Sequence, residues 1–411
     1  MTAPVFGQSF TRPDNEIQPA LGADFSQTLV IETSEDASAV EFPEDTPKRF
    51  STSDADAMAA LGTGLLKDAV QGIHDQLSGL NAGADVTVVR VPEGVDTAAT
   101  AAAIAGIVGG VASIPSEVNK TPRIVVAGRT AWRPDLETTN PVIAALEANL
   151  PKILAVAPVD VDDTSAANAI DARETMSSER LMPLGVAARV WEGETVVTRP
   201  LAPRIAGLMA RIDNQVGGGK PFHPFANRPL YGLAGLSRKI PFSTLDGSVE
   251  GQQLLAANVS IVAEGETGVD GAIADGGYKF IGTDNAQTGE LWEQIHQVRG
   301  TDYIITQFIE ITNQFLGRQL KADTVEAWIN SLAFALRDHK ADGNILGYSD
   351  KSKMFTRASN SPEQIRLGHL KLEIGIEPAP VFKLAQHEIR RYRPAVEGLV
   401  NEIIERLGAG A

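Results

Sequence analysis

The chain has 411 residues, of which 43% are hydrophobic and 21% are charged, so it can bury a sizeable core in two or three packed units. Its 36 basic residues against 52 acidic ones give a formal net charge of −16, which disfavours a general electrostatic grip on nucleic acid. The absence of cysteine excludes disulfides, thiolate nucleophiles, iron–sulfur clusters and zinc sites of the cysteine type.

The first 24 residues predict an extended arm rather than a packed helix. Prolines and glycines recur from Pro4 to Gly22, and the apolar side chains between them, such as Val5, Phe6 and Phe10, are scattered. The segment also lacks the basic and apolar regions of a secretory signal. We therefore expect the protein to stay in a cytoplasm or in a particle assembled there.

From residue 28 the pattern changes to short apolar strands separated by helices. Strands are predicted over residues 28–31, 86–91 and 123–127, and helices over residues 54–80 and 141–149. Strands that alternate with helices indicate βαβ units around a mostly parallel sheet.

The uncharged stretch of residues 97–116 is long enough to cross a membrane, but it consists mostly of Ala, Gly, Thr and Ser. It also contains Pro115 near its end. A buried helix that connects two strands explains it better, so we expect no direct insertion into a membrane.

The last third of the chain has an α+β pattern. Strands are predicted over residues 259–263 and 278–281, followed by a long helix over residues 292–316 and a second helix that Asp323 would cap. The predicted domains are an N-terminal arm (1–24), an α/β domain (25–250), an α+β core domain (251–368) and a C-terminal arm strand with a terminal helix (369–411).

Two features of the C-terminal segment are typical of surfaces that contact another molecule. Residues 370–376 alternate strictly, so one face of a strand carries the apolar side chains Leu370, Leu372, Ile374 and Ile376. A basic cluster follows in an otherwise acidic chain, with Glu388 beside it: Arg390, Arg391 and Arg393. This cluster could meet an acidic partner, or it could be an ordinary solvated surface.

No catalytic or cofactor motif is complete. Gly219 and Lys220 suggest a phosphate loop, but Pro221 stands where Ser or Thr must hold magnesium. His387 and Glu388 begin a zinc-protease pattern whose second histidine is replaced by Arg391. We therefore predict no catalytic residue, no metal site and no cofactor.

Five separated blocks resemble the contractile tail sheath proteins of myophages and phage-tail-like bacteriocins. The central block is NRPLYGLAGLSRKIPF at residues 227–242, followed by EGQQLLAANV at 250–259. The others are PRIAGLMARID at 203–213, GGYKFIGT at 276–283 and RGTDYI at 299–304. The chain departs from the family where Gly300 replaces a second arginine and where the C-terminal helical tail, residues 394–407, is longer.

The resemblance implies a structural protein with a multi-subdomain α/β and α+β fold and no enzymatic activity. Six copies would form each ring of a helical stack around a tail tube protein, and contraction would drive the tube through a cell envelope. Baseplate and tail terminator proteins would be further partners, without nucleic acid. The N-terminal arm and the strand at residues 370–376 would be exchanged between subunits, and residues 388–393 would contact the tube or a neighbour.

Two other classes of protein fit parts of the pattern. The βαβ units between residues 86 and 159 could bind a nucleotide or a sugar at the carboxyl ends of their strands, as in an α/β enzyme. A non-contractile virion or tube component would also assemble from many copies of one chain.

Overall fold

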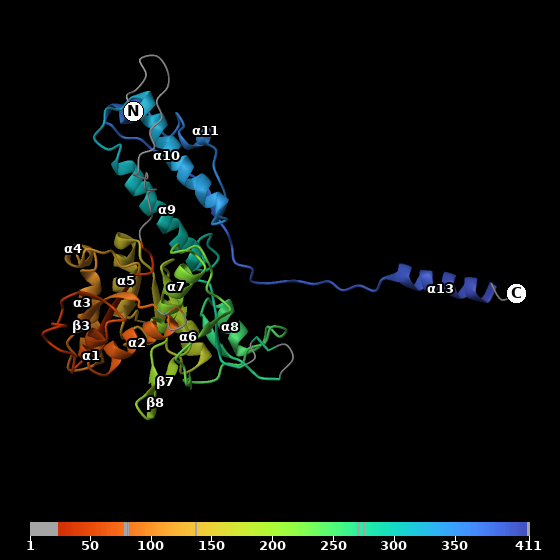
Figure 1. The fold of residues 1–411 in the computed structure, drawn as a ribbon, viewed down its shortest axis with the longest axis horizontal. Coiled ribbons are helices and arrows are strands. Elements are labelled where there is room, and N and C mark those ends of the chain that lie inside the picture. Colours follow the sequence, from red (N-terminus) through yellow and green to blue (C-terminus); the bar gives the residue numbers. More distant parts are fainter. Residues whose placement is uncertain are drawn as a thin grey trace, which may run out of the picture. The chain divides into compact units, whose positions relative to one another are not determined.

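The computed structural model describes residues 24–77, 80, 82–135, 138–268, 272–273 and 276–408. Val5, Phe6 and Phe10, the apolar residues of the expected N-terminal arm, lie outside the described residues. Contacts divide the chain into one unit of residues 1–379 and a second unit of residues 380–411 (Figure 1). None of the helices in the described ranges combines the length and the apolar composition that crossing a membrane requires.

A four-stranded sheet forms the centre of the first unit. The strand order is β2–β3–β1–β4, with β1 parallel to both β3 and β4 and β2 antiparallel to β3. All six residues of β1 are buried, as expected for a strand covered on both faces. The mostly parallel sheet predicted from the sequence is confirmed. The strands are β1 (Thr28–Thr33), β2 (Lys48–Ser51), β3 (Asp85–Val91) and β4 (Ile124–Ala127).

Helices connect and cover these strands. Helix α2 packs against α7, and α3 packs against α5. The strand that follows α5 in the chain, β5, pairs in parallel with β6. These elements are α1 (Ala55–Ala60), α2 (Leu65–Leu77), α3 (Thr97–Gly109), α4 (Ile114–Val118), α5 (Pro141–Ile153), β5 (Ala157–Asp160), α6 (Ala166–Glu174), β6 (Leu181–Leu184) and α7 (Ala202–Gln215).

The helix predicted over residues 54–80 is broken into α1 and α2. Gly62 and Gly64 have φ angles of 71° and 85°, the left-handed region that favours glycine. A Cβ at Gly62 would also lie 2.3 Å from Oδ1 of Asp36. The prediction missed this break because the apolar spacing continues across the two glycines.

Two small antiparallel sheets follow in the chain. In one, the hairpin β7–β8 is extended by β10, and in the other β12 lies between β11 and β9. Strand β12 has the bounds predicted from the sequence. The elements are β7 (Ala188–Glu192), β8 (Thr195–Arg199), β9 (Arg228–Leu230), β10 (Gly235–Leu236), α8 (Glu250–Ala256), β11 (Ile261–Glu264) and β12 (Tyr278–Ile281).

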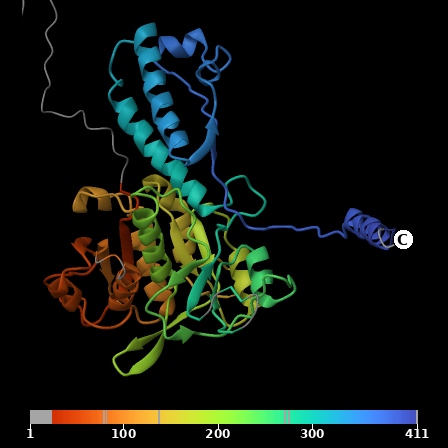
Figure 2. The ribbon, with the colours of Figure 1, turned by 45° about the vertical axis from the view of Figure 1, so that its right-hand side comes forward.

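The end of the first unit has its own apolar cluster, built from Phe25, Phe222, Tyr303, Leu336 and others. Figure 2 shows the two long helices α9 and α10 side by side in teal and blue. Helix α10 begins at Ala322, so Asp323 lies in its first turn, near the positive end of the helix dipole, rather than at the N-cap. The elements are α9 (Ile295–Asn313), α10 (Ala322–Ala341), β13 (Ile345–Tyr348), α11 (Lys351–Met354), α12 (Pro362–Arg366) and β14 (Ile376–Pro378).

The second unit is an extended stretch followed by the helix α13 (Arg393–Gly408). Every residue from 382 to 408 is exposed.

Candidate functional site

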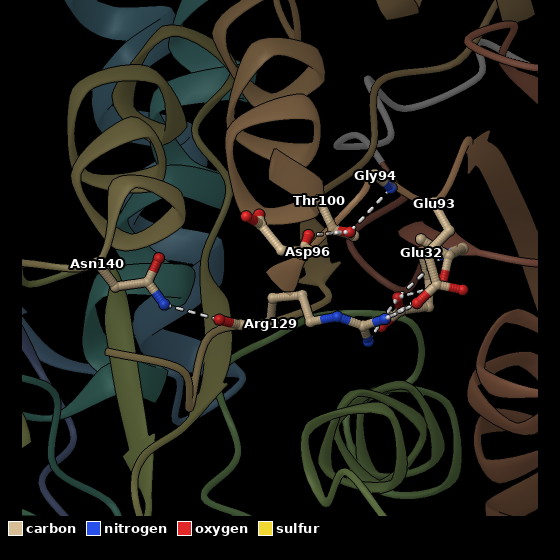
Figure 3. A network of polar contacts seen from close by, with 8 residues as sticks. Glu32, Glu93, Gly94, Asp96, Thr100, Arg129 and Asn140 are labelled. Atoms are coloured by element: carbon tan, nitrogen blue, oxygen red, sulfur yellow. Dashed lines mark hydrogen bonds and ion pairs between the residues drawn. The ribbon is translucent and has the colours of Figure 1, made fainter. Parts of the chain in front are cut away.

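The carboxyl ends of β1, β3 and β4 are where an α/β enzyme would bind a small ligand. At this edge Arg129, with a φ of 61°, lies between two carboxylates (Figure 3). Its Nη1 is 3.4 Å from Oε1 of Glu32, and its Nη2 is 3.3 Å from Oε1 of Glu93. Burial raises the pKa of the Glu32 carboxyl, and the charge of Arg129 opposes the shift. The arginine is therefore engaged within the chain.

The loops around Arg129 are held by helix caps. Asn140, the N-cap of α5, accepts from the N–H of Val142 at 2.8 Å, and its amide donates to the carbonyl of Arg129 at 2.7 Å. Asp96 caps α3 by accepting from the N–H of Ala99 at 2.7 Å. The polar groups drawn in Figure 3 thus serve the local structure.

A cavity of about 280 Å³ lies beside this edge, lined by Glu32, Arg129, Trp132, Asp160 and Arg199 among others. The N–H groups of Leu201 and Ala202 donate to Oδ1 of Asp160 at 2.8 and 3.2 Å. The N-terminus of α7, where a nucleotide phosphate would bind, is therefore already occupied by a carboxylate of the chain itself. Lys220 of the incomplete phosphate loop instead pairs with Asp342 at 2.6 Å.

The buried Asp160 predicts a dependence of stability on pH. Burial raises its pKa to about 7, and the two backbone N–H groups only partly oppose this shift. The folded state therefore binds a proton more tightly than the unfolded chain, so this residue's contribution to stability falls as pH rises from about 4 through about 7. We expect Asp160→Asn to gain about 1–4 kcal/mol relative to the parent between those limits.

Urea unfolding of both proteins at several pH values, followed by circular dichroism, measures this difference. Parallel curves for parent and variant would show that Asp160 does not titrate in this range. Asp36 provides a matched control, because hydrogen bonds from Thr63 lower the pKa of its exposed carboxyl. Asp36→Asn should therefore show no gain over the parent as pH rises above 4.

Buried arginine–aspartate pairs fix α9 to the rest of the unit. Arg299 and Asp213 are each 1% exposed in their side chains, with Nη2 2.5 Å from Oδ2 and Nη1 3.1 Å from Oδ1. Arg180 pairs with Asp302 one turn along, with Nη2 3.0 Å from Oδ1. Burial raises the pKa of Asp213, and Arg299 opposes the rise. These pairs join α9 to α7 and to the residue before β6.

The Arg299–Asp213 pair and a contact between Arg211 and Tyr231 connect sequence blocks that carry the family resemblance. Arg299 and Asp302 belong to the block at 299–304, Asp213 ends the block at 203–213, and Arg211 lies 4.5 Å from the ring centre of Tyr231 in the central block. The predictions from the sequence gave these charges no structural role. The sequence feature that could have indicated these buried pairs is the presence of charged residues among the apolar residues of the helices.

Close packing against Phe222 explains why position 300 is a glycine. A Cβ there would lie 2.5 Å from Cδ1 of Phe222, whose ring packs 5.7 Å from Tyr303 and 5.0 Å from His339. The second arginine that the family often has at this position would not fit this arrangement.

The apolar face predicted at residues 370–376 lies against its own chain. Leu370, Leu372, Ile374 and Ile376 are half-buried, whereas the residues between them are exposed, as the alternation predicted. Ile374 and Ile376 pack on the apolar cluster of α9 and α10. Only Ile376–Pro378 forms a regular strand, β14, which pairs with β13 and leaves the outer edges of this two-stranded sheet without a strand among the described residues.

The basic cluster lies in the exposed second unit. Arg390 donates from Nε to Oε1 of Glu388 at 2.8 Å, and Nε of Arg393 is 2.9 Å from Oε1 of Glu397. Arg391 is exposed beside them. The charged side chains of this cluster thus pair with one another within the second unit.

Comparisons with known proteins agree with the resemblance. No model of a known protein family matches the chain. It is 23% identical over 309 residues to a protein of Pseudomonas aeruginosa (strain UCBPP-PA14) named as a putative prophage major tail sheath protein, a match that covers 72% of this chain and 74% of that protein.

Solved structures match over most of the chain. The helical sheath of the anti-feeding prophage (AFP) in its contracted state matches 94% of this chain and 100% of its own, with a TM-score of 0.64 and 14% identity. The sheath complex of the extracellular contractile injection system PVC, also contracted, matches 94% and 98%, with a TM-score of 0.64 and 13% identity. A chain of the AFP baseplate has a TM-score of 0.65 at 12% identity, over 94% of this chain and 100% of its own.

This is a contractile tail sheath fold. The resemblance predicted from the sequence blocks is confirmed, as is the mixture of α/β and α+β parts. The proteins that share the sheath fold here are structural components rather than enzymes.

Proposed function

We propose that the chain is the sheath subunit of a contractile phage tail or phage-tail-like particle, assembled in a bacterial cytoplasm. Copies form stacked hexameric rings around a tail tube protein, bounded by baseplate and tail terminator proteins. The observation that carries this proposal is the likeness to the contracted AFP sheath over 94% of the chain. A second match, to a chain of the 6-fold symmetrised AFP baseplate, supports the sixfold ring.

Contraction in this proposal uses energy stored in the lattice rather than nucleotide hydrolysis. The incomplete phosphate loop and the capped N-terminus of α7 support this view, because neither offers a phosphate site. Subunits assembled in a less favourable arrangement release free energy when they repack. A few kcal/mol per copy, summed over many copies, is enough to bias such a transition strongly.

Strand exchange links the copies in this proposal. The two-stranded sheet β13–β14, with Ile376 in it, offers outer edges to which a neighbour's extended segment can add. One donor in this proposal is the N-terminal arm with Val5, Phe6 and Phe10. Residues 370–376, which the sequence predicted as the second donor, pack on their own unit, and the extended stretch of residues 380–392, which begins two residues after β14 ends and includes Glu388, Arg390 and Arg391, takes that role instead. Backbone hydrogen bonds of this kind persist while the subunits rotate.

Electron microscopy of the purified protein tests the proposal. We expect hollow helical cylinders, whereas an α/β enzyme would form small closed oligomers and a non-contractile component would form tubes of one fixed state. Deletion of residues 1–20 or of residues 380–411 should leave a folded monomer by circular dichroism that no longer polymerises. Cylinders formed by both truncated proteins would contradict strand exchange.

A further inference from the structure

Helix α13 presents one continuous apolar face to solvent. Its large apolar side chains recur every three or four residues and are between 47% and 75% exposed: Val396, Leu399, Val400, Ile403, Ile404 and Leu407. A helix with such a stripe normally packs against another surface. An isolated helix of 16 residues is only marginally stable in water. The stripe is therefore a packing surface whose counterpart lies outside the helix.

The first unit carries an open apolar groove of matching character. It has a volume of about 610 Å³ and lies along α10 and α11. Its apolar walls consist of Leu320, Val325, Ile329, Phe355, Ile365 and Leu370. Leu320 is 42% exposed. A groove of this size accepts several aliphatic side chains from a helix.

The charges around the two surfaces are complementary. Lys321 and Lys351 line the groove together with Glu326, which leaves the lining with one excess positive charge. Helix α13 carries Glu397, Glu402 and Glu405 against Arg393 and Arg406, which pair with Glu397 and Glu402, so the helix has one excess negative charge. An acidic helix of this kind is attracted to a basic rim, which favours α13 over a basic partner as the occupant.

The stretch between the units gives α13 the reach to find another molecule. Residues 380–392 are extended, and a chain of that length spans up to about 45 Å. A second copy of this chain carries the same groove and is the partner that the proposed polymer supplies at high local concentration.

We propose that the apolar face of α13 docks in the α10–α11 groove of a second copy. This inference rests on the proposed polymerisation, and it adds a helix-in-groove contact to the exchange of strands. The helix acts as an anchor at the end of the arm, so that the arm stays attached while its extended part changes direction.

Substitutions on α13 test the helix side of the contact. Ile403→Asp places a charge at the centre of the stripe, and we expect it to raise the protein concentration needed for polymerisation about tenfold or more. Asn401→Asp adds the same charge on the opposite face of α13 and should leave that concentration unchanged. Equal effects of the two variants, measured by light scattering and sedimentation, would overturn the proposal.

The groove side is tested in the same way. Leu320→Asp should raise the concentration for polymerisation as Ile403→Asp does. Leu291 is 92% exposed and outside the groove, so Leu291→Asp is the matched control. Circular dichroism of each variant shows whether the first unit is still folded. A folded Leu320→Asp variant that polymerises like the parent would also overturn the proposal.

Because the chain has no cysteine, a disulfide can identify the two copies directly. Proteins carrying only Ile403→Cys and only Val325→Cys are mixed and oxidised, and we expect a cross-linked heterodimer. Polymers without this cross-link would overturn the docking and leave the sheath function standing. A cross-link without polymers would support the docking and contradict the sheath function. In a chain carrying both substitutions, a cross-linked monomer alone would show that α13 occupies its own groove, which also overturns the proposal.

Discussion

Replacing Arg299 with alanine is expected to lower the free energy of unfolding by about 3–5 kcal/mol. The reason is that Asp213 would remain 1% exposed without its partner, as a buried carboxyl that must either carry an uncompensated charge or bind a proton. The carbonyl of Phe25 would also lose the N–H of Arg299 Nη2, now 3.2 Å away. Urea unfolding of the purified chain measures the loss.

A double variant distinguishes the effect of an unpaired charge from the effect of lost side-chain volume. Arg299→Met with Asp213→Leu removes both charges and keeps much of the volume, so it should recover most of the lost stability. The exposed pair of Arg337 and Asp338, with side chains 63% and 68% exposed, is the control, and Arg337→Ala should change stability by less than about 1 kcal/mol. A loss at Arg299 no greater than at Arg337 would contradict the role assigned to the buried pair.

Gly207→Ala is expected to cost about 2–3 kcal/mol, although the substitution improves the intrinsic helix propensity. A Cβ at Gly207 would lie 2.7 Å from the carbonyl oxygen of Ile73 and 2.8 Å from its Cα. Backbone atoms cannot rotate away as a flexible side chain can, so α2 and α7 would have to separate. These two helices pack directly on each other in the core of the first unit.

A glycine-to-alanine substitution in α3 is expected to change stability in the opposite direction. Gly106 has no atom within 4 Å of an added Cβ, so Gly106→Ala should stabilise the protein by up to about 1 kcal/mol. Thermal unfolding of both variants and the parent measures whether close packing or helix propensity decides the change in stability. A stabilised Gly207→Ala variant would show that α2 and α7 do not approach as closely as the structure indicates.

Much of the α/β part could be predicted because its signals are local. Runs such as residues 28–31 and 86–91 are apolar and β-branched, and they became β1 and β3. Asn140 directly before Pro141 is a typical start of a helix, and the capping bond of Asn140 at the start of α5 is present. The strict alternation at residues 370–376 gave the correct buried face, although few of those residues form a regular ladder.

The features that could not be predicted from the sequence depend on contacts between distant residues. The pairing of Arg299 with Asp213 joins positions 86 residues apart, and nothing in either local pattern names the partner. The requirement for glycine at position 300 comes from Phe222, which lies in a loop. The apolar face of α13 follows the same spacing as a packed helix, so periodicity alone could not show that its side chains are exposed.

The buried pairs of α9 have a mechanical consequence. If the chain is the proposed sheath subunit, a load on α9 would be transmitted to α7 and to the start of β6 through Arg299–Asp213 and Arg180–Asp302. Bidentate pairs enclosed by apolar side chains tolerate little sliding, because any displacement exposes charge to a medium that solvates it poorly. In the proposed sheath, the junction of α9 with α7 and β6 should therefore resist deformation.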